Sequence, residues 1–404
     1  AAIVASGCDD TAVQLVIHAN LEIPAEVDAL CLQIAAEGEL DFSRRYPLTA
    51  EMAGRPMTAT VLPGERHDRS FEVLMTGERR GIPVSYTRRT FQFRAAEVVD
   101  EHLYIQRCDQ QLNGGNDGFV WGGQLTTRPG SVAAAMPVPR APSQLVVVWS
   151  GEGRRFMHTD LVRVLSGGLP PVPAGDLRRL LAVDVDGDCD RDLVLLAPGG
   201  PELWRHGSDG TFEHRSNDIQ LGGPFDDVAA ADFNLDGRVD LVLVSSAGVR
   251  LLLNNGNGTF RDGSDVLPGG GLNEARAVAV GFIDPDSYPD IVVGRGITKG
   301  LRNKILLNTY DPPKKALSFA LHDASSREGK TRALGLGRLD RDGLDDLVLA
   351  DEGSEPVALQ NTSLAGAPKL VPGVIKLAST GKTAVEDLLV VDVDADCDDD
   401  LVLA

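Results

Sequence analysis

The chain has 404 residues, enough for two or three domains, and its formal net charge is −20. This acidic balance argues against a nucleic-acid-binding protein, which needs a basic surface. No apolar run approaches the roughly 18 residues of a membrane-spanning helix.

The first eight residues, AAIVASGC, resemble the end of a bacterial lipoprotein signal. Small residues at Ala5-Ser6-Gly7 fit a processing peptidase, and the thiol of Cys8 accepts a lipid, although Ala5 stands where Leu is commonest. On this interpretation residues 1–8 are a signal remnant, and lipidated Cys8 tethers an exported bacterial protein to a membrane surface. The alternative is a cysteine that lies near the start of the chain by chance.

Short strand-like runs separated by Gly, Pro and acidic turns fill the next hundred residues. They cover residues 9–17, 28–35, 57–62, 70–76, 83–94 and 98–107. Their spacing predicts an Ig-like β-sandwich over 9–110, with a brief helix or loop at 49–56. The Gly- and Asn-rich segment 111–131 is predicted to be a linker, with a strand around 118–127.

Four cysteines follow Cys8, and none has Cys-X-X-Cys or zinc-site spacing. Cys31 and Cys108 fall in the predicted sandwich, where they form a disulfide or remain two buried thiols. Cys189 and Cys397 occupy equivalent positions in two separate repeats. We expect these two to be unpaired, because a disulfide needs Cα atoms within about 7 Å.

From about residue 132 the chain is repetitive, and the last Asp of an acidic loop marks each repeat. The markers are Asp192, Asp240, Asp290, Asp346 and Asp400, in steps of 48, 50, 56 and 54 residues. An apolar run precedes each loop, a second follows it, and a third reads LLNNGNGTF at 252–260. A front copy has the same strand pattern and an acid-free loop, MPVPRAPSQ.

Four short strands in about 50 residues, repeated radially, are typical of a β-propeller blade. A β-helix is the main rival, but its coils are usually shorter. The sequence therefore predicts an all-β protein in which a six- or seven-bladed propeller over 132–404 follows the sandwich. The ring closes through an earlier segment such as 118–127, or a seventh blade lies beyond this chain.

These repeats resemble the FG-GAP/VCBS family, the blades of integrin-α-like propellers. The resemblance rests on a D-x-[DN]-x-D-x-x-x-D loop that recurs at blade spacing between two apolar runs. It implies a Ca²⁺ ion in the hairpin between the first two strands of a blade. Positions 1, 3, 5 and 9 of each loop would supply side-chain ligands, and position 7 a backbone carbonyl.

The implied ligands lie in five acidic loops, 184–192, 232–240, 282–290, 338–346 and 392–400. They are Asp184, Asp186, Asp188, Asp190 and Asp192; Asp232, Asn234, Asp236, Arg238 and Asp240; Asp284, Asp286 and Asp290; Asp340, Asp342 and Asp346; and Asp392, Asp394, Asp396, Asp398 and Asp400. The third and fourth loops depart from the pattern, because position 1 is Phe282 or Arg338. These two sites should bind more weakly, and Arg338 is a candidate for a built-in cation in the fourth.

The acidic loops fit an EF-hand or an ion-free turn less well than a propeller calcium loop. An EF-hand needs flanking helices and a Glu at position 12, where Leu243 stands in a β-branched run. Acidic turns without an ion would crowd several carboxylates that repel one another.

No catalytic constellation is recognisable. The seven histidines show no H-x-x-x-H spacing, and GKT at 381–383 lacks the earlier Gly of a phosphate loop. We expect a non-enzymatic, calcium-stabilised scaffold at the bacterial cell surface or outer membrane that binds a protein or glycan through propeller loops. A carbohydrate-active enzyme with a site in the funnel and a structural subunit of an extracellular assembly are the alternatives.

Overall fold

The computed structural model is all-β among the residues it describes, apart from two 3₁₀ turns, Ala50–Met52 and Ser264–Val266. It describes residues 11–36, 39–63, 70–94, 97–105, 134–137, 145–148, 156–158, 178–189, 192–206, 212–215, 218–296, 298, 300–340, 344–377, 385, 387–391 and 399–403. The chain divides into two compact units: Ala1–Gln111 with Gly187–Asp190, and Leu112–Asp186 with Arg191–Ala404. Within the described ranges, no helix is long and apolar enough to cross a membrane.

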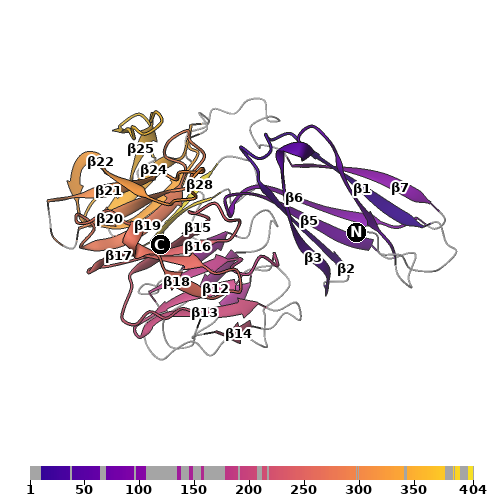
Figure 1. The fold of residues 1–404 in the computed structure, drawn as a ribbon, viewed down its shortest axis with the longest axis horizontal. Helices are drawn as coiled ribbons and strands as arrows, with labels where there is room; N and C mark the ends of the chain where they lie inside the picture. The colour runs from indigo at the N-terminus through magenta and orange to yellow at the C-terminus, as the bar shows by residue number, and fades with distance from the viewer. Residues whose placement is uncertain are drawn as a thin grey trace. The chain divides into compact units, whose positions relative to one another are not determined.

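The first unit contains two sheets that share one hydrophobic core (Figure 1). One has the strand order β4-β1-β7 and the other β3-β2-β5-β6. Side chains alternate between the two faces of a strand, so Val13, Leu15 and Ile17 of β1 all enter the core. The strands are β1 (Ala12–Ala19), β2 (Ala29–Ala36), β3 (Glu39–Pro47), β4 (Met57–Val61), β5 (Ser70–Arg79), β6 (Ile82–Gln92) and β7 (Val98–Ile105).

The six strands predicted in this region are confirmed, with ends that differ by a few residues. The segment 49–56 contains the 3₁₀ turn. One strand, β3, was not predicted from the sequence.

The second unit contains repeated antiparallel sheets, which we call blades. The first four each have four strands in sequence order, and the fifth has two described strands. They are β11 (Arg179–Val183), β12 (Asp192–Ala197), β13 (Gly200–His206) and β14 (Phe212–His214); β15 (Asp227–Ala231), β16 (Asp240–Ser245), β17 (Gly248–Asn254) and β18 (Phe260–Asp262); β19 (Ala275–Gly281), β20 (Asp290–Arg295), β21 (Leu301–Asn308) and β22 (Phe319–Gly329); β23 (Thr331–Gly337), β24 (Asp346–Asp351), β25 (Val357–Asn361) and β26 (Leu370–Pro372); and β27 (Leu388–Val391) and β28 (Asp400–Leu403).

The front copy of the repeat forms a sheet of its own. Its strands are β8 (Ala134–Pro137), β9 (Leu145–Val148) and β10 (Phe156–His158), and they pair in the order β10-β9-β8. The strand pairing predicted for this copy is therefore confirmed, while most of its loop, 138–144, lies outside the described residues.

All five acidic loops are hairpins in the same register. The residue before each loop pairs with its ninth residue, as in Val183↔Asp192 and Ala231↔Asp240, and equally in Gly281↔Asp290, Gly337↔Asp346 and Val391↔Asp400. The predicted placement of the loops between the first two strands of a blade is therefore confirmed.

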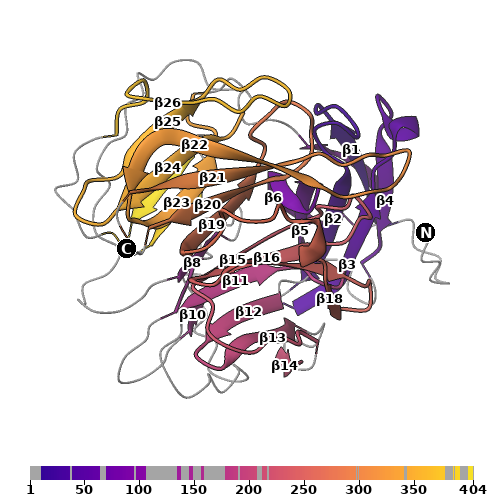
Figure 2. The ribbon, with the colours of Figure 1, turned by 60° about the vertical axis from the view of Figure 1, so that its left-hand side comes forward.

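The blades pack face to face, and their first strands lie side by side in chain order. In Figure 2 the first blade runs from β11 near the middle of the unit to β14 at its edge. Apolar side chains of neighbouring blades form shared cores, for example Leu196 and Leu203 with Leu241 and Leu243. No strand pairing joins one sheet to the next among the described residues, so packing and hydrogen bonds outside the strand ladders connect the blades.

This arrangement is propeller-like. The number of blades, the sandwich class of the first unit and the domain bounds stay predictions. The predicted lipid-acceptor Cys8 and the strand at 118–127 lie outside the described residues.

Candidate functional site

The first acidic loop brings three predicted ligands together. Carboxylate oxygens of Asp184, Asp186 and Asp188 lie within 4.8 Å of one another. Two oxygens on opposite sides of a Ca²⁺ ion, each about 2.4 Å from it, are separated by a similar distance. An all-oxygen, all-carboxylate donor set suits this hard cation, so the residues fit the ion that the sequence implies. Asp190 lies outside the described residues.

In the second loop the predicted ligands bond to the loop's own backbone. Asp232 accepts the N–H groups of Asp236 and Gly237 at 3.0 and 2.8 Å, and Asn234 Oδ1 accepts the Asp236 N–H at 3.1 Å. Gly237 has φ +83°, a left-handed conformation that tightens the turn at little steric cost. The oxygens of positions 1 and 3 therefore both face the inside of the loop.

Arginine side chains accompany the first two loops. Arg238 forms an ion pair with Asp236 and donates from Nε to the Asn254 carbonyl at 3.0 Å. In the first loop Arg205 Nη1 lies 3.8 Å from Asp186 Oδ2. The sequence predicts that the backbone carbonyl of Arg238 binds the ion, and this role remains a prediction. Its guanidinium offsets part of the loop's negative charge.

The ninth residue of each of the first four loops is fully buried and acts as a clamp. One carboxylate oxygen accepts the N–H of loop position 2, and the other accepts an N–H at the end of the third strand. Asp240 does so with Phe233 at 3.1 Å and Asn254 at 2.8 Å. Asp192, Asp290 and Asp346 repeat the pattern at 2.8–2.9 Å. The structure shows these four residues in a structural role, as acceptors of two backbone hydrogen bonds. Their role as metal ligands remains a prediction.

Burial raises the pKa of three of these clamp carboxyls, Asp192, Asp240 and Asp290, and the neighbouring acids raise it further. The pKa of Asp192 rises to about 8 because of burial, with Asp186 and Asp184 adding to the effect, while N–H groups oppose it. Burial likewise raises the pKa of Asp240 to about 8. The pKa of Asp290 is well above its usual range for the same reason. A divalent cation would relieve the repulsion in such a loop.

A recurring asparagine was missed as a functional position. Asn254, Asn308 and Asn361 end the third strands of three successive blades and are buried. Their amide groups donate to the position 2 carbonyl of the preceding blade: Asn254 to Val185 at 2.7 Å, Asn308 to Phe233 at 2.9 Å, and Asn361 to Ile283 at 2.9 Å. The signal was available, since Asn recurs at the end of each of these third runs.

The third and fourth loops bring fewer carboxylates inward. Phe282, at position 1, is buried. Asp284 accepts the N–H groups of Asp286 at 3.2 Å and of Gly366, from the next blade, at 2.6 Å. Asp340 accepts from Gln360 Nε2 at 2.5 Å. Asp342 lies outside the described residues.

Arg338 forms its ion pair with Asp345, with Nε 3.8 Å from Oδ1. Asp345 is position 8 of the fourth loop, which is not one of the predicted ligands. Of the predicted ligands in the fifth loop, Asp392, Asp394, Asp396 and Asp398 lie outside the described residues. Asp400 is described by its backbone alone.

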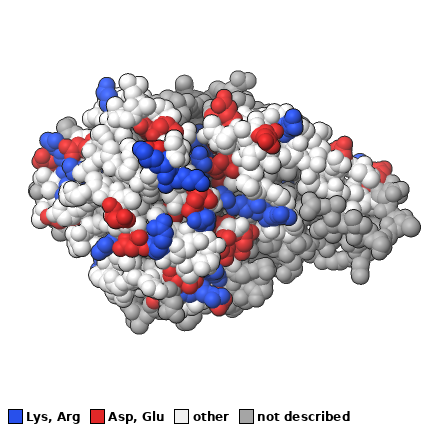
Figure 3. Space-filling view, viewed as in Figure 1, with Lys and Arg blue, Asp and Glu red and all other residues white. Residues whose placement is uncertain are grey.

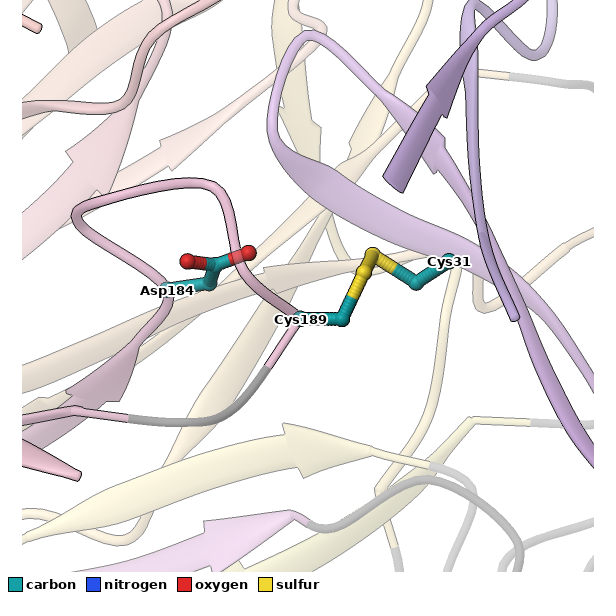
Figure 4. Close-up of side chains that lie close together, drawn as sticks. All are labelled: Cys31, Asp184 and Cys189. Carbon is teal, nitrogen blue, oxygen red and sulfur yellow. A yellow bond between two sulfur atoms is a disulfide. The ribbon is translucent and has the colours of Figure 1, made fainter. Parts of the chain in front are cut away.

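The cysteine predictions were wrong in part. Cys31 of β2 is bonded to Cys189, with the Cα atoms 5.7 Å apart (Figure 4). Cys189 was expected to be unpaired, and the candidate partner for Cys31 was Cys108. Repeat position suggested that Cys189 belongs only with the blades, but Gly187–Asp190 cluster with the first unit. Gln33 Nε2 and Ser43 Oγ also donate to carbonyls of this segment. Both thiols are consumed in the disulfide, so neither is a metal ligand.

A family model for FG-GAP-like repeats matches residues 184–243 and 232–293. The match covers the first three acidic loops and supports an FG-GAP β-propeller-like protein. No curated protein sequence matches the chain.

Two solved structures show limited likeness. One is an Agrocybe aegerita lectin, described by its recognition of non-reducing terminal N-acetylglucosamine, at 17% identity and TM-score 0.36; the match covers 58% of this chain and 60% of the lectin. The other is a quinoprotein alcohol dehydrogenase-like protein from Bacteroides thetaiotaomicron, at 8% identity and TM-score 0.31, with 93% and 74% covered. Neither likeness is close enough to indicate a function.

Proposed function

We propose that this protein is a calcium-stabilised β-propeller that serves as an extracellular binding scaffold for a protein or a glycan. In the chain, the propeller follows an Ig-like sandwich over 9–110. The observation that carries the proposal is the shared hairpin register of five repeats, each of which carries acidic residues at fixed loop positions. A structural role for the ion follows from this repetition, because a catalytic ion would need only one site.

Asp184, Asp186 and Asp188 would hold the ion in the first loop, and Asp232, Asn234 and Asp236 in the second. Calcium would neutralise carboxylates that otherwise repel one another and would fix the hairpin against its neighbours. The Cys31–Cys189 disulfide supports an oxidising compartment, which agrees with export and a tether through Cys8.

The two ends of the blades differ in how freely they can bind a partner. Turns after the first and third strands lie at one end of an antiparallel sheet. Contacts between blades are made there: Arg205, near the end of β13, donates to the Asn257 carbonyl at 2.9 Å, and Gly366 donates to Asp284 at 2.6 Å. These turns are therefore committed to holding the blades together.

The other end carries the connections between successive blades, including 263–274 and the described residues 373–377. Val374, on the second of them, is 55% exposed. Loops on a rigid scaffold are the usual place for recognition, so we assign binding to this end. On the face seen in Figure 3, Lys and Arg side chains lie among Asp and Glu side chains, which suits a mixed polar partner better than a strongly charged one.

Calcium titration by calorimetry tests the metal part of the proposal. The full chain should bind Ca²⁺, and Asp186→Asn combined with Asp236→Asn should abolish the tight component. Asp323→Asn removes an exposed carboxylate on strand β22, outside the five acidic loops, and should leave calcium binding unchanged. Absence of calcium binding would overturn this part.

A panel of immobilised glycans and cell-surface proteins tests the recognition part. Replacing 265–271, which keeps buried Leu272 and the Arg295 partner Asn273, by a Gly/Ser segment of equal length should abolish a specific interaction while the thermal midpoint stays within a few degrees. No specific binding across the panel, or binding unaffected by this replacement and by that of 373–377, would contradict the assignment.

A further inference from the structure

The junctions between successive blades fall into two kinds, depending on where a carboxylate stands. Position 1 is Asp184 and Asp232 in the first two loops, and Phe282 and Arg338 in the next two. In the blade that follows each of these loops, position 8 is Val239, Pro289, Asp345 and Asp399 respectively. An aspartate thus appears at position 8 of the following blade only at the junctions where position 1 has lost it.

The two position 8 aspartates accept hydrogen bonds from the loop of the preceding blade. Asp345 Oδ2 accepts the Phe282 N–H at 2.7 Å, while the Asp345 N–H donates to the Phe282 carbonyl at 3.2 Å. Asp399 Oδ2 accepts the Arg338 N–H at 2.7 Å. The same contact therefore recurs at two junctions, between the third and fourth blades and between the fourth and fifth.

Glycines make room for these carboxylates. A Cβ at Gly281 would lie 2.6 Å from Asp345 Oδ2, and one at Gly337 would lie 2.8 Å from Asp399 Oδ2. The equivalent residues of the first two blades are Val183 and Ala231. Three features therefore occur together: position 1 is not Asp, the residue before it is Gly, and position 8 of the next blade is Asp. Their joint occurrence indicates a single structural feature of these junctions.

Arg338 supports the first of these contacts. Its Nε lies 3.8 Å from Asp345 Oδ1, while Oδ2 of the same carboxylate serves Phe282. The arginine at position 1 of the fourth loop thus helps to orient the aspartate that holds the third loop.

We propose that Asp345 and Asp399 are positioning residues that lock the third and fourth acidic loops without a cation. The first two loops, 184–192 and 232–240, depend on calcium instead. This inference rests on the proposed function for the calcium dependence of the first two loops, but the two aspartate contacts stand independently. The propeller then has a cation-dependent part and a cation-independent part.

Peptide-resolved hydrogen exchange of the full chain, with Ca²⁺ and with EDTA, tests the division. In EDTA, amides of 184–192 and 232–240 should exchange about tenfold faster, while those of 282–290 and 338–346 should not change. Equal acceleration in all four loops would overturn the proposal. If exchange became faster in none of the four loops, the calcium dependence of the first two loops would be overturned. The role of Asp345 and Asp399 would then be decided by their variants alone.

Asp345→Ala should accelerate exchange in 282–290 about tenfold, with or without EDTA, and leave 184–192 unchanged. Asp399→Ala should do the same for 338–346. Asp323→Ala, on the third blade, is the matched control and should change neither loop. If Asp345→Ala fails to fold, Asp345→Asn keeps the size and one acceptor oxygen and should give a smaller acceleration at the same loop. Unchanged exchange in 282–290 in the Asp345 variants would overturn the proposal.

Discussion

One carboxylate oxygen of Asp240 accepts the backbone N–H of Asn254 at 2.8 Å, and this bond ties an acidic loop to the end of the third strand. The side chain of Asn254 continues the connection to the preceding blade, where it donates to the Val185 carbonyl at 2.7 Å. Both residues are buried, and their equivalents repeat the same contacts in the next two blades. The Asp–Asn pair is thus a structural unit of the repeat.

Replacing Asp240 by alanine should destabilise the protein by about 2–4 kcal/mol, since two buried N–H groups lose their acceptor. Denaturant unfolding measures this change. Asp262→Ala, in the same blade, removes a largely exposed carboxylate and should lower the free energy of unfolding by less than about 1 kcal/mol. Equal effects of the two substitutions would argue against the clamp.

Asn254→Ala should lower the free energy of unfolding by about 2–3 kcal/mol, because the buried carbonyls of Val185 and Val239 lose their donor. The adjacent Asn255 provides the control, as its side chain bonds only to exposed Thr259 among the contacts described. Asn255→Ala should have a small effect. A larger loss for Asn255→Ala than for Asn254→Ala would contradict the role assigned to the asparagine.

The repeats could be predicted because their signal is local and recurs. Apolar runs on either side of each loop mark strands, and the near-constant interval fixes the hairpins, so the strands that flank the five acidic loops were all found. Strand β3 could not be found this way. It lies at the edge of its sheet, and its sequence ELDFSRRYP carries four charged residues among few apolar ones. Among its described side chains, Phe42 and Tyr46 pack against the core.

The contacts between repeats were harder to foresee. An asparagine at a strand end indicates polarity but not the carbonyl it reaches in another blade, as with Asn308 and Phe233, 75 residues apart. The Cys31–Cys189 disulfide spans 158 residues, and chain spacing alone cannot choose among cysteine pairings. Predicting the ligands of a loop is easier, because they are neighbours in sequence.

Peptide mapping without reduction should recover a peptide pair linked through Cys31 and Cys189. Cys31→Ser and Cys189→Ser should each lower the thermal midpoint, and the double variant should lower it no further than either single one. Cys108→Ser should leave this linked pair intact. Recovery of a Cys31–Cys108 pair instead would contradict the structure.

Asp227 lies in a buried charged cluster that joins three blades. Arg179 Nε is 2.9 Å from Asp227 Oδ1, and the same guanidinium is paired with Asp387. Asp227 Oδ2 also accepts the Val278 N–H at 2.9 Å. Burial raises the pKa of Asp227 to about 6; Arg179 opposes the rise and Asp387 adds to it.

This raised pKa gives stability a defined pH dependence. An aspartate whose folded pKa exceeds its unfolded value of about 3.9 contributes stability below the unfolded pKa, and that contribution is lost as pH rises to about 6. The loss is on the order of 3 kcal/mol. Asp192 and Asp240 also contribute to the fall in stability over this range, so Asp227→Asn should reduce the slope between pH 4 and 6 in denaturant unfolding, whereas the neighbouring, less buried Asp226→Asn should leave it unchanged. An unchanged slope in Asp227→Asn would contradict the assignment.

Thermal unfolding of the full chain in Ca²⁺ and in EDTA, combined with the metal content of the purified protein, tests the central claim most directly. The account predicts bound calcium and a midpoint that falls by about 10 °C or more on chelation, since binding to the native state alone raises its stability. It predicts that Asp186→Asn with Asp236→Asn removes most of this difference. A metal-free protein whose midpoint is the same in Ca²⁺ and EDTA would contradict a calcium-stabilised propeller.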